Sequence, residues 1–190
     1  MIKWEKYFSR VMPEVKGVPA PMAIQAIRDA AIEFCQKTWI WKQDIPYEME
    51  EGFREIFVSV PRGARLVSVI YLLENGRQKH LPENIMIKSQ RSPVEAELPA
   101  EKDKEYEARV ALKPSETSTE GPEFLYNDHA EAIAHGAKAR LMYDLRKDWG
   151  QPELAGVHHQ MFRQAIAQEK IRMQQGYSQK TSRVRPRRFV

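Results

Sequence analysis

The sequence predicts an α+β fold: a three-helix bundle, a small antiparallel β unit inserted between helix 1 and a C-terminal helical hairpin, and an extended C-terminal arm. Three observations predict it. Apolar residues recur at spacings of three and four near the start of the chain and again in its C-terminal half. The middle of the chain is rich in β-branched and aromatic residues, and the last fourteen residues are basic without helical periodicity.

The first predicted helix covers roughly residues 21–39. Pro19 and Pro21 suit its start, because proline costs least in the first helical turn. Polar residues fill one side of this segment, so its apolar stripe must be buried against another element. The stripe consists of Ile24, Ile27, Ala31, Phe34, Cys35 and Thr38.

Residues 45–114 are predicted to form the inserted β unit. Its clearest strand is 65–73, and Asn75-Gly76 follows directly, the dipeptide favoured by a type I′ hairpin turn. The acidic run Glu48, Glu50 and Glu51 beside Asp44 is interpreted as a solvated loop rather than a catalytic pair. The other predicted strands are 55–60, the returning arm 77–81, 85–88 and 105–112, with a loop at 92–104 and a link at 115–122.

Two further helices are predicted at about 123–147 and 152–175, and the short connection between them indicates an antiparallel hairpin. Gly136 lies inside the first of them, where glycine costs about 1 kcal/mol relative to alanine; it indicates either a close helix crossing or a tolerated small volume. The predicted buried stripe of the first is Leu125, Ala130, Ile133, Ala137, Leu141 and Leu145. That of the second is Leu154, Val157, Met161, Phe162, Ala165 and Ile166.

The chain is accordingly divided into three parts. Residues 1–44 and 115–176 form the helical bundle, 45–114 the inserted β unit, and 177–190 the C-terminal arm. The arm carries five basic residues and no acidic one, whereas the rest of the chain holds 25 basic and 26 acidic residues. This distribution argues against a uniformly basic nucleic-acid-binding domain. No run of 18 apolar residues is present, which excludes a membrane-spanning helix.

The histidines do not have the spacing of a metal site. His129 and His135 are six residues apart rather than four, and the adjacent pair His158-His159 would point in different directions on a helix. Asp128, His129 and Glu131 are a weak candidate site without a second cluster to complete it. We therefore interpret these histidines as structural.

Cys35 lies on the apolar stripe of the first helix and is interpreted as a small core residue rather than a nucleophile. No glycine-rich phosphate loop, nucleophile elbow or zinc signature occurs in the chain. The sequence predicts no catalytic, cofactor-binding or metal-binding residue and no cofactor, and hence a protein that is not an enzyme.

The aromatic residues Trp39, Trp41, Tyr47 and Phe53 allow two interpretations. They could form a stacking platform for nucleic acid. Acidic neighbours outnumber the basic ones in this region, so packing beneath the β unit is the favoured interpretation.

The C-terminal arm is the most informative feature for function. Its plainest interpretation is a solvated basic end. Its arginines and its apolar tip Phe189-Val190 also suit an extended segment that binds an acidic groove or adds to a sheet edge of a partner. Nucleic acid would use the same charges. The candidate contact residues are Lys180, Arg183, Arg185, Arg187, Arg188 and Phe189.

The order of these features resembles a known family. The strings that carry the resemblance are PAPMA at 19–23, IRDAAIEFC at 27–35, VPRGARLVSV at 60–69, NGR at 75–77 and VALKPS at 110–115, followed by the helical pair and the arginine-rich end. Together they resemble the head-to-tail adaptor (connector) proteins of tailed bacteriophages, including the tail tubular protein A type of short-tailed phages. The resemblance spans nearly the whole chain.

The resemblance implies structural work in the neck of a virion, between capsid and tail, after assembly in the host cytoplasm. Members of the family form rings, typically dodecameric, which dock to the portal protein and provide the platform for a tail or nozzle protein. On this chain the portal contacts would come from the arm, at Lys180, Arg183, Arg185, Arg187, Arg188 and Phe189. DNA would meet the protein only as it passes through the lumen of the ring, and no membrane is involved.

A nucleic-acid-binding protein that uses its basic arm is the alternative function. At most five charges would release counterions, so the dependence of affinity on salt would have a slope no steeper than about −4.5 on duplex DNA. An enzyme with an unrecognised site ranks last, since only the region of His129 offers candidate residues.

Overall fold

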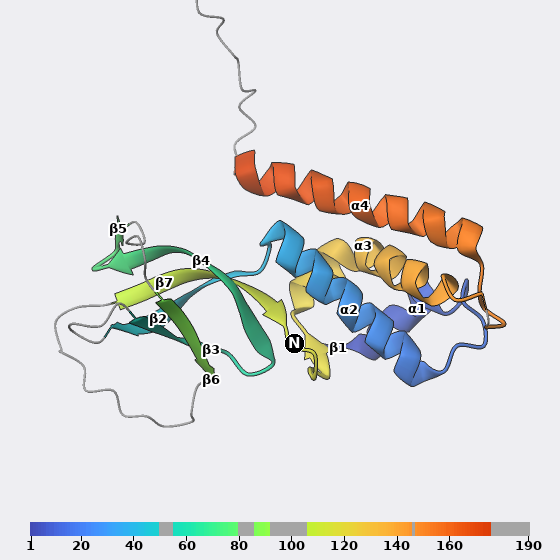
Figure 1. The fold of residues 1–190 in the computed structure, drawn as a ribbon, viewed down its shortest axis with the longest axis horizontal. Coiled ribbons are helices and arrows are strands. Elements are labelled where there is room, and N and C mark those ends of the chain that lie inside the picture. Colours follow the sequence, from blue (N-terminus) through green and yellow to red (C-terminus); the bar gives the residue numbers. More distant parts are fainter. Residues whose placement is uncertain (50–54, 80–85, 92–105, 146, 176–190) are drawn as a thin grey trace, which may run out of the picture.

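The computed structural model describes residues 1–49, 55–79, 86–91, 106–145 and 147–175. A helical lobe and a sheet lobe lie next to each other along the longest axis of the molecule (Figure 1). Each lobe has its own cluster of buried apolar side chains, and Trp41 packs against both clusters. The two lobes therefore meet at the point where the first long helix passes into the sheet.

The N-terminal residues form part of the helical lobe. They comprise β1 (Ile2–Lys3), the 3₁₀ turn η1 (Trp4–Tyr7) and α1 (Phe8–Val11). Five apolar side chains at spacings of three and four are buried here: Trp4, Tyr7, Val11, Val15 and Val18. This row has helical spacing, but Pro13 and Gly17 interrupt the segment and prevent one continuous helix.

Trp4 ties this N-terminal segment to the chain beyond the sheet. Its indole Nε1 donates a hydrogen bond to the carbonyl oxygen of Ser118 at 3.0 Å. β1 pairs with β8 (Glu120–Gly121), and a Cβ at Gly121 would come within 2.3 Å of the Trp4 ring. Glycine is therefore required where the tryptophan ring crosses this strand.

The three long helices are α2 (Ala20–Thr38), α3 (Glu123–Met142) and α4 (Pro152–Gln175). α3 packs against both α2 and α4, and α4 lies on the outside of the lobe (Figure 1). They cross closely at Gly136, where an added Cβ would lie 2.9 Å from Ala30 Cβ and 2.9 Å from the Phe162 ring. Of the two interpretations left open for Gly136, the structure supports the close crossing.

α3 ends at Met142, so its expected extension to residue 147 is wrong. The chain turns back between the two helices, with the Gly150 amide donating to the Lys147 carbonyl at 2.8 Å and Gln151 donating to Met142 at 2.8 Å. A Cβ at Gly150 would lie 2.2 Å from the carbonyl oxygen of Asp144, so glycine permits this turn. As a consequence Leu145 is exposed rather than part of the buried stripe.

The larger sheet has six strands within the described residues, in the order β5-β4-β7-β2-β3-β6. All neighbouring pairs are antiparallel except β3 and β6, which run parallel. β5 and β6 follow each other in sequence but lie at opposite edges of the sheet. The strands are β2 (Lys42–Met49), β3 (Glu55–Val60), β4 (Ala64–Glu74), β5 (Arg77–Lys79), β6 (Met86–Arg91) and β7 (Tyr106–Pro114).

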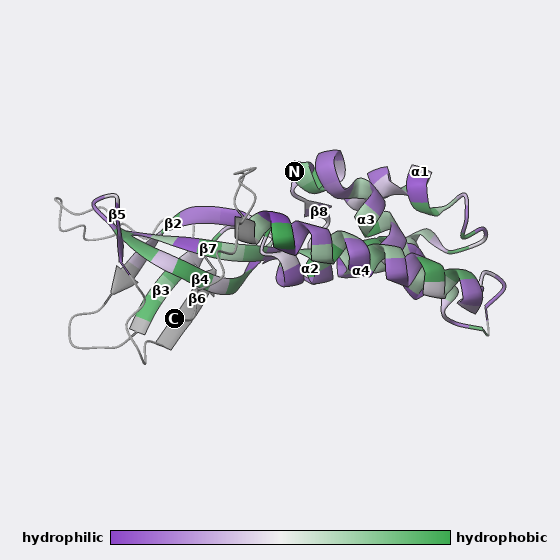
Figure 2. Ribbon diagram, turned by 90° about the horizontal axis from the view of Figure 1, so that it is seen from above, coloured by the Kyte–Doolittle hydropathy of each residue, from purple (hydrophilic) through white to green (hydrophobic). Residues whose placement is uncertain are grey.

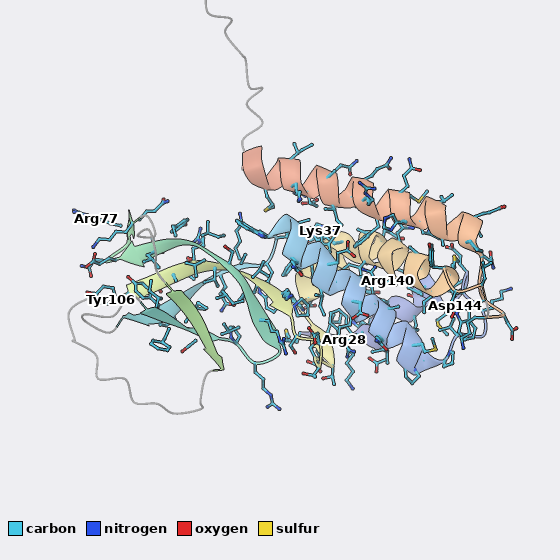
Figure 3. The ribbon with its side chains drawn as sticks, viewed as in Figure 1. Arg28, Lys37, Arg77, Tyr106, Arg140 and Asp144 are labelled. Carbon is cyan, nitrogen blue, oxygen red and sulfur yellow. The ribbon has the colours of Figure 1, made fainter. Side chains whose placement is uncertain are left out.

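The turn predicted at Asn75-Gly76 is confirmed. Both residues have positive φ, 49° for Asn75 and 71° for Gly76, as a type I′ turn requires. Arg77, the first residue of the returning strand, and Tyr106, the first residue of β7, lie at the end of the sheet lobe away from the helices (Figure 3).

β2 lies where the sequence predicted a solvated acidic loop, at least as far as Met49. Asp44 lies opposite Arg109 of β7 and accepts a hydrogen bond from Arg109 Nε at 2.6 Å. This hydrogen bond holds the pKa of Asp44 below its ordinary value. The acidic residue is thus one half of a cross-strand ion pair, an arrangement that composition alone does not distinguish from a loop.

The expected three-helix bundle with a small antiparallel β unit is therefore wrong. In the part of the chain that the structure describes, the fold is α+β with four α-helices, a two-stranded sheet and a six-stranded mixed sheet. The bundle gains α1 because the N-terminal apolar residues are buried in it, and the β part is larger because β2 adds a strand between β7 and β3. The division of the chain at residues 44, 115 and 177 stays a prediction.

The volume available at Gly136 leads to a prediction about stability. We expect Gly136→Ala to lower the free energy of unfolding by about 1–2 kcal/mol, because the strain of overpacking against Ala30 and Phe162 exceeds the gain in helix propensity. Gly156 in α4 is the matched control, since nothing lies within 4 Å of an added Cβ there. Gly156→Ala should raise stability by up to about 1 kcal/mol in the same chemical denaturation experiment. Equal effects of the two substitutions would contradict the close crossing.

Candidate functional site

The predicted portal contacts lie outside the described residues, which end at Gln175. This applies to the whole set of Lys180, Arg183, Arg185, Arg187, Arg188 and Phe189. In sequence the arm follows α4 directly. α4 is therefore the described element that lies nearest to the arm in sequence.

α4 contacts the rest of the lobe along a narrow stripe. Ala155, His158, Phe162 and Ile166 are buried at spacings of three and four. Three of the residues that the sequence placed on this buried stripe are instead exposed: Leu154 by 45%, Val157 by 47% and Met161 by 44%. We call these three residues the apolar row.

The apolar row has helical spacing of its own. Residues 154, 157 and 161 are three and four apart, so their side chains share one face of α4 beside the buried stripe. Hydrophobic residues recur along α4 among hydrophilic ones (Figure 2). Ile171, near the other end of the helix, is also exposed. One helix thus presents apolar side chains in two directions, inward to α3 and outward to the surface.

Beneath the start of α4 lies a polar cluster of Glu14, His135, Lys138 and His158, drawn from three parts of the chain. The ring nitrogens His135 Nδ1 and His158 Nδ1 are 2.8 Å apart, and the two rings stack. His158 Nε2 lies 2.9 Å from Glu14 Oε2, and Lys138 forms an ion pair with Glu14. Lys138 is almost fully buried, so Glu14 supplies its counter-charge.

The hydrogens in this cluster follow from the geometry. His158 Nε2 donates to the Glu14 carboxylate, and one of the two facing Nδ1 atoms must carry the hydrogen while the other accepts it. Burial, His158 and Lys138 lower the pKa of His135. The hydrogen bond from Lys138 lowers the pKa of Glu14. The cluster connects α3 to α4 and to the segment before α2 most favourably when His135 is neutral.

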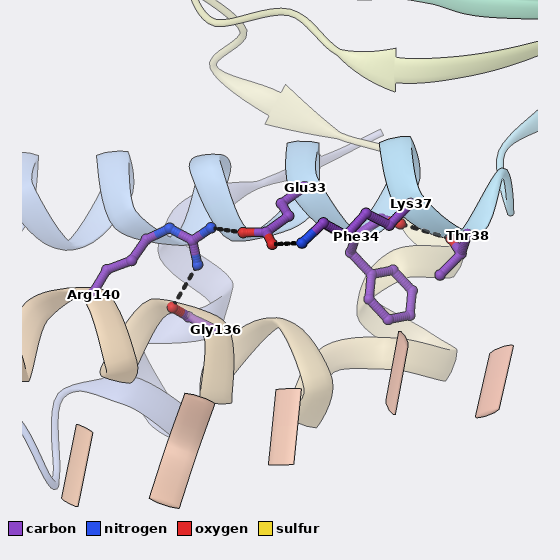
Figure 4. A network of polar contacts seen from close by, with 6 residues as sticks. All are labelled: Glu33, Phe34, Lys37, Thr38, Gly136 and Arg140. Atoms are coloured by element: carbon purple, nitrogen blue, oxygen red, sulfur yellow. Dashed lines mark hydrogen bonds and ion pairs between the residues drawn. The ribbon is translucent and has the colours of Figure 1, made fainter. Parts of the chain in front are cut away.

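A second network holds α2 against α3 at the Gly136 crossing (Figure 4). Arg140 donates to the carbonyl oxygen of Gly136 at 2.7 Å and forms an ion pair with Glu33, which also pairs with Lys37. The Arg140 guanidinium lies 5.6 Å from the centre of the Phe162 ring. Through Phe162, this network contacts the buried stripe of α4. The apolar row lies outside these contacts.

The weak candidate metal site predicted from the sequence does not form a ligand group among the described residues. Asp128, His129 and Glu131 line one cavity together with Glu169 of α4. Among the described residues no group of three or more His, Cys, Asp or Glu side chains is placed to hold a metal ion. The backbone of His129 leaves the helical region, with φ −131° and ψ 16°, so α3 is kinked at this cavity.

The interpretation of Cys35 as a core residue is confirmed. Its side chain is fully buried, and burial raises the pKa of the thiol to about 12. A thiol with so high a pKa is not a nucleophile near neutral pH.

The four aromatic residues do not share one environment. Tyr47 is buried in the sheet core, and Trp41 is partly buried between the lobes. Trp39 caps the end of α2 with a φ of 54° and is partly exposed, and Phe53 lies outside the described residues. Core packing is confirmed for Tyr47 alone.

Two comparisons complete the description. No protein-family model and no curated protein matches this chain. In the described part of the chain, no helix has the length and apolar character needed to cross a membrane. The exposure of Leu154, Val157 and Met161 could not be predicted from the sequence, because periodicity groups apolar residues without showing which of them the neighbouring helix covers.

The histidines lead to a pH prediction. The pKa of both His129 and His135 is lowered in the folded protein, chiefly by burial, so the unfolded chain binds more protons as the pH falls below about 6.5. We expect the free energy of unfolding to fall between about pH 7 and pH 5. This dependence should be weaker in His135→Gln, measured by chemical denaturation at each pH.

His159→Gln is the control for that experiment, because His159 lies on the exposed side of α4. It should leave the pH dependence as in the wild type. An unchanged pH dependence in His135→Gln would contradict the assignment of His135 as a group that must stay neutral in the fold.

Proposed function

We propose that this chain is a structural head-to-tail adaptor of a tailed bacteriophage. Copies of it form a ring, dodecameric as the resemblance implies, which docks to the portal through the C-terminal arm and provides the platform for a tail or nozzle protein. It acts in the virion neck, and DNA passes through its lumen. The observation that carries this proposal is the apolar row on α4, an outward-facing interaction surface on the outermost helix.

The apolar row supports association with other copies of the chain. An amphipathic helix of a monomer needs a single apolar stripe, whereas α4 has a second one at Leu154, Val157 and Met161. Covering that row with protein removes apolar surface from water. Nearly balanced charge outside the arm, 25 basic against 26 acidic residues, lets copies pack side by side without strong repulsion.

A closed ring places constraints on such contacts. The apolar row of one copy must meet a different surface on the next copy, because only head-to-tail contacts generate rings larger than a dimer. α4 suits this role, since its inward stripe anchors it on α3 while its outer face stays open.

The arm supplies the contacts with the second partner, the portal protein. Arginine makes paired hydrogen bonds to carboxylates, so Arg183, Arg185, Arg187 and Arg188 suit an acidic surface of the portal protein. Phe189 adds an apolar anchor at the tip. The arm follows the helix that carries the apolar row, so ring contacts and portal contacts come from consecutive parts of the chain.

The ring proposal is tested by Val157→Glu. A charge in the middle of the apolar row should prevent side-by-side packing, and we expect the self-association constant to fall by more than tenfold. Sedimentation velocity gives the oligomeric state of each protein. Ala167→Glu adds the same charge at an exposed position of α4 outside the row and should leave assembly unchanged. A wild-type protein that is monomeric at high concentration would overturn the proposal.

The docking proposal is tested in the full chain with Arg183, Arg185, Arg187 and Arg188 all changed to Gln. Electron microscopy of the wild-type protein mixed with its cognate portal should show rings stacked coaxially on the portal. The variant should still form rings, because the apolar row is intact, but it should not stack. Normal stacking of the variant would refute the arm assignment. Loss of duplex DNA binding without loss of stacking would favour the nucleic-acid alternative.

A further inference from the structure

Two histidines join α4 to α3 beneath the apolar row. His135 of α3 and His158 of α4 stack with their ring centres 5.1 Å apart, and their Nδ1 atoms are 2.8 Å apart. We call these two residues the histidine pair. Among residues 152–161, the first ten of α4, only Ala155 and His158 are buried. The histidine pair is therefore one of the few inward contacts that hold this part of the helix.

The distance between the two Nδ1 atoms leaves room for a single hydrogen. One Nδ1 donates it and the other accepts it, so the accepting ring must be neutral. An imidazolium ring is a donor at both of its nitrogens. If both rings were protonated, two N–H groups would point at each other and two positive charges would lie in contact. The histidine pair therefore holds one extra proton but not two.

The surrounding charges do not favour a second proton. Glu14 pairs with the buried Lys138 and also accepts a hydrogen bond from His158 Nε2 at 2.9 Å, so its carboxylate is already shared. The pKa of His135 is lowered first by burial and then by His158 and Lys138. The charged groups that act on the pair are Glu131 and Lys138 of α3, Glu14 of the segment before α2, and Arg10 of α1 through its ion pair with Glu131.

Acid consequently favours separation of the two rings. Once apart, each ring titrates near the ordinary histidine pKa of about 6.5 and binds its own proton. Separation therefore takes up at least one proton that the closed pair cannot hold, and its equilibrium constant rises as the pH falls below about 6.5. Between pH 7.5 and pH 5.5 this linkage raises the constant by at least about tenfold.

Loss of the histidine pair affects the start of α4 more than the rest of the helix. Beyond residue 161 the helix stays anchored by Phe162 at the Gly136 crossing and by the buried Ile166. Neither of these apolar contacts titrates. The apolar row lies entirely within the part of the helix that loses its anchor.

We propose that the histidine pair is an acid-sensitive latch for the start of α4. Near neutral pH, one hydrogen between the two rings holds residues 152–161 against α3. Below about pH 6, a second proton separates the rings, and this segment with its apolar row detaches from α3 while the rest of the fold remains. The inference goes beyond the proposed function and does not depend on ring formation, because it rests on contacts within one copy of the chain.

The test is hydrogen–deuterium exchange of the full-length protein, measured by mass spectrometry at pH 7.5 and pH 5.5. The samples are compared at a concentration where sedimentation velocity gives the same oligomeric state at both pH values. Protection factors, from which the intrinsic pH dependence of exchange has been divided out, report the opening of each segment. We expect the protection of residues 152–161 to fall by at least about tenfold at pH 5.5, and that of α2 by a smaller factor.

His135→Gln removes one titrating ring but keeps a hydrogen-bonding group at this position. The glutamine amide has both a donor and an acceptor, so it can match His158 Nδ1 whether or not that nitrogen carries a hydrogen. The protection of residues 152–161 should then be nearly independent of pH. His159→Gln is the matched control, since His159 is exposed and adjacent to the pair in sequence, and it should behave as the wild type.

The wild type alone can overturn the proposal, whether or not the variant folds. Equal protection of residues 152–161 at both pH values would do so. An equal loss of protection in α2 and in the start of α4 would also do so, because it would indicate global unfolding rather than local release. A folded His135→Gln protein that loses protection in this segment as strongly as the wild type would overturn the assignment of the latch to this pair.

Discussion

At Gly136 three helices approach one another so closely that no side chain fits between them. Ala30 of α2 and the ring of Phe162 of α4 both face the same glycine of α3. Helix packing distances depend on the side chains at the contact, and small residues allow the closest approach. Arg140 reinforces the crossing, since it donates to the Gly136 carbonyl and pairs with Glu33. The close approach of α4 to α3 and α2 therefore depends on this contact.

The rest of the molecule depends on where that crossing leaves the ends of the helices. α2 leads through Trp41 into β2, and its last turns lie against β7, where Lys113 Nζ donates to Gln36 Oε1 at 3.2 Å. The N-terminal segment is tied to the chain beyond β7 by β1–β8 pairing and by the indole of Trp4. Trp41 packs against both hydrophobic clusters and so connects the two lobes.

The surface of α4 and the interior beneath it have different physical roles. Beneath the helix, Glu14, His135, Lys138 and His158 contact one another in a partly buried network, in which Glu14 pairs with the buried Lys138 and helps to position the helix. On its outside, the apolar row exposes apolar side chains to solvent. In the proposed ring, the apolar row is presented on a helix that its inner contacts hold in place.

The sequence by itself determined the local structure with short-range causes. The spans of α2 and α4, the strands at 55–60 and 65–73 and the Asn75-Gly76 turn follow from periodicity, β-propensity and turn chemistry, which act between residues close in the chain. The sequence also shows helical spacing of the N-terminal apolar residues from Trp4 to Val18, although proline and glycine interrupt this segment.

Only the tertiary structure decided which apolar residues are covered. Leu154, Val157 and Met161 have the same periodicity as Phe162 and Ile166, but α3 reaches only one side of α4, so the first three remain exposed. The same holds for Asp44, whose partner Arg109 is 65 residues away, and for the cavity at the kink of α3, which is lined by His129 of α3 and Glu169 of α4. These features depend on contacts between distant parts of the chain, and a pattern along one segment contains no information about what packs against it.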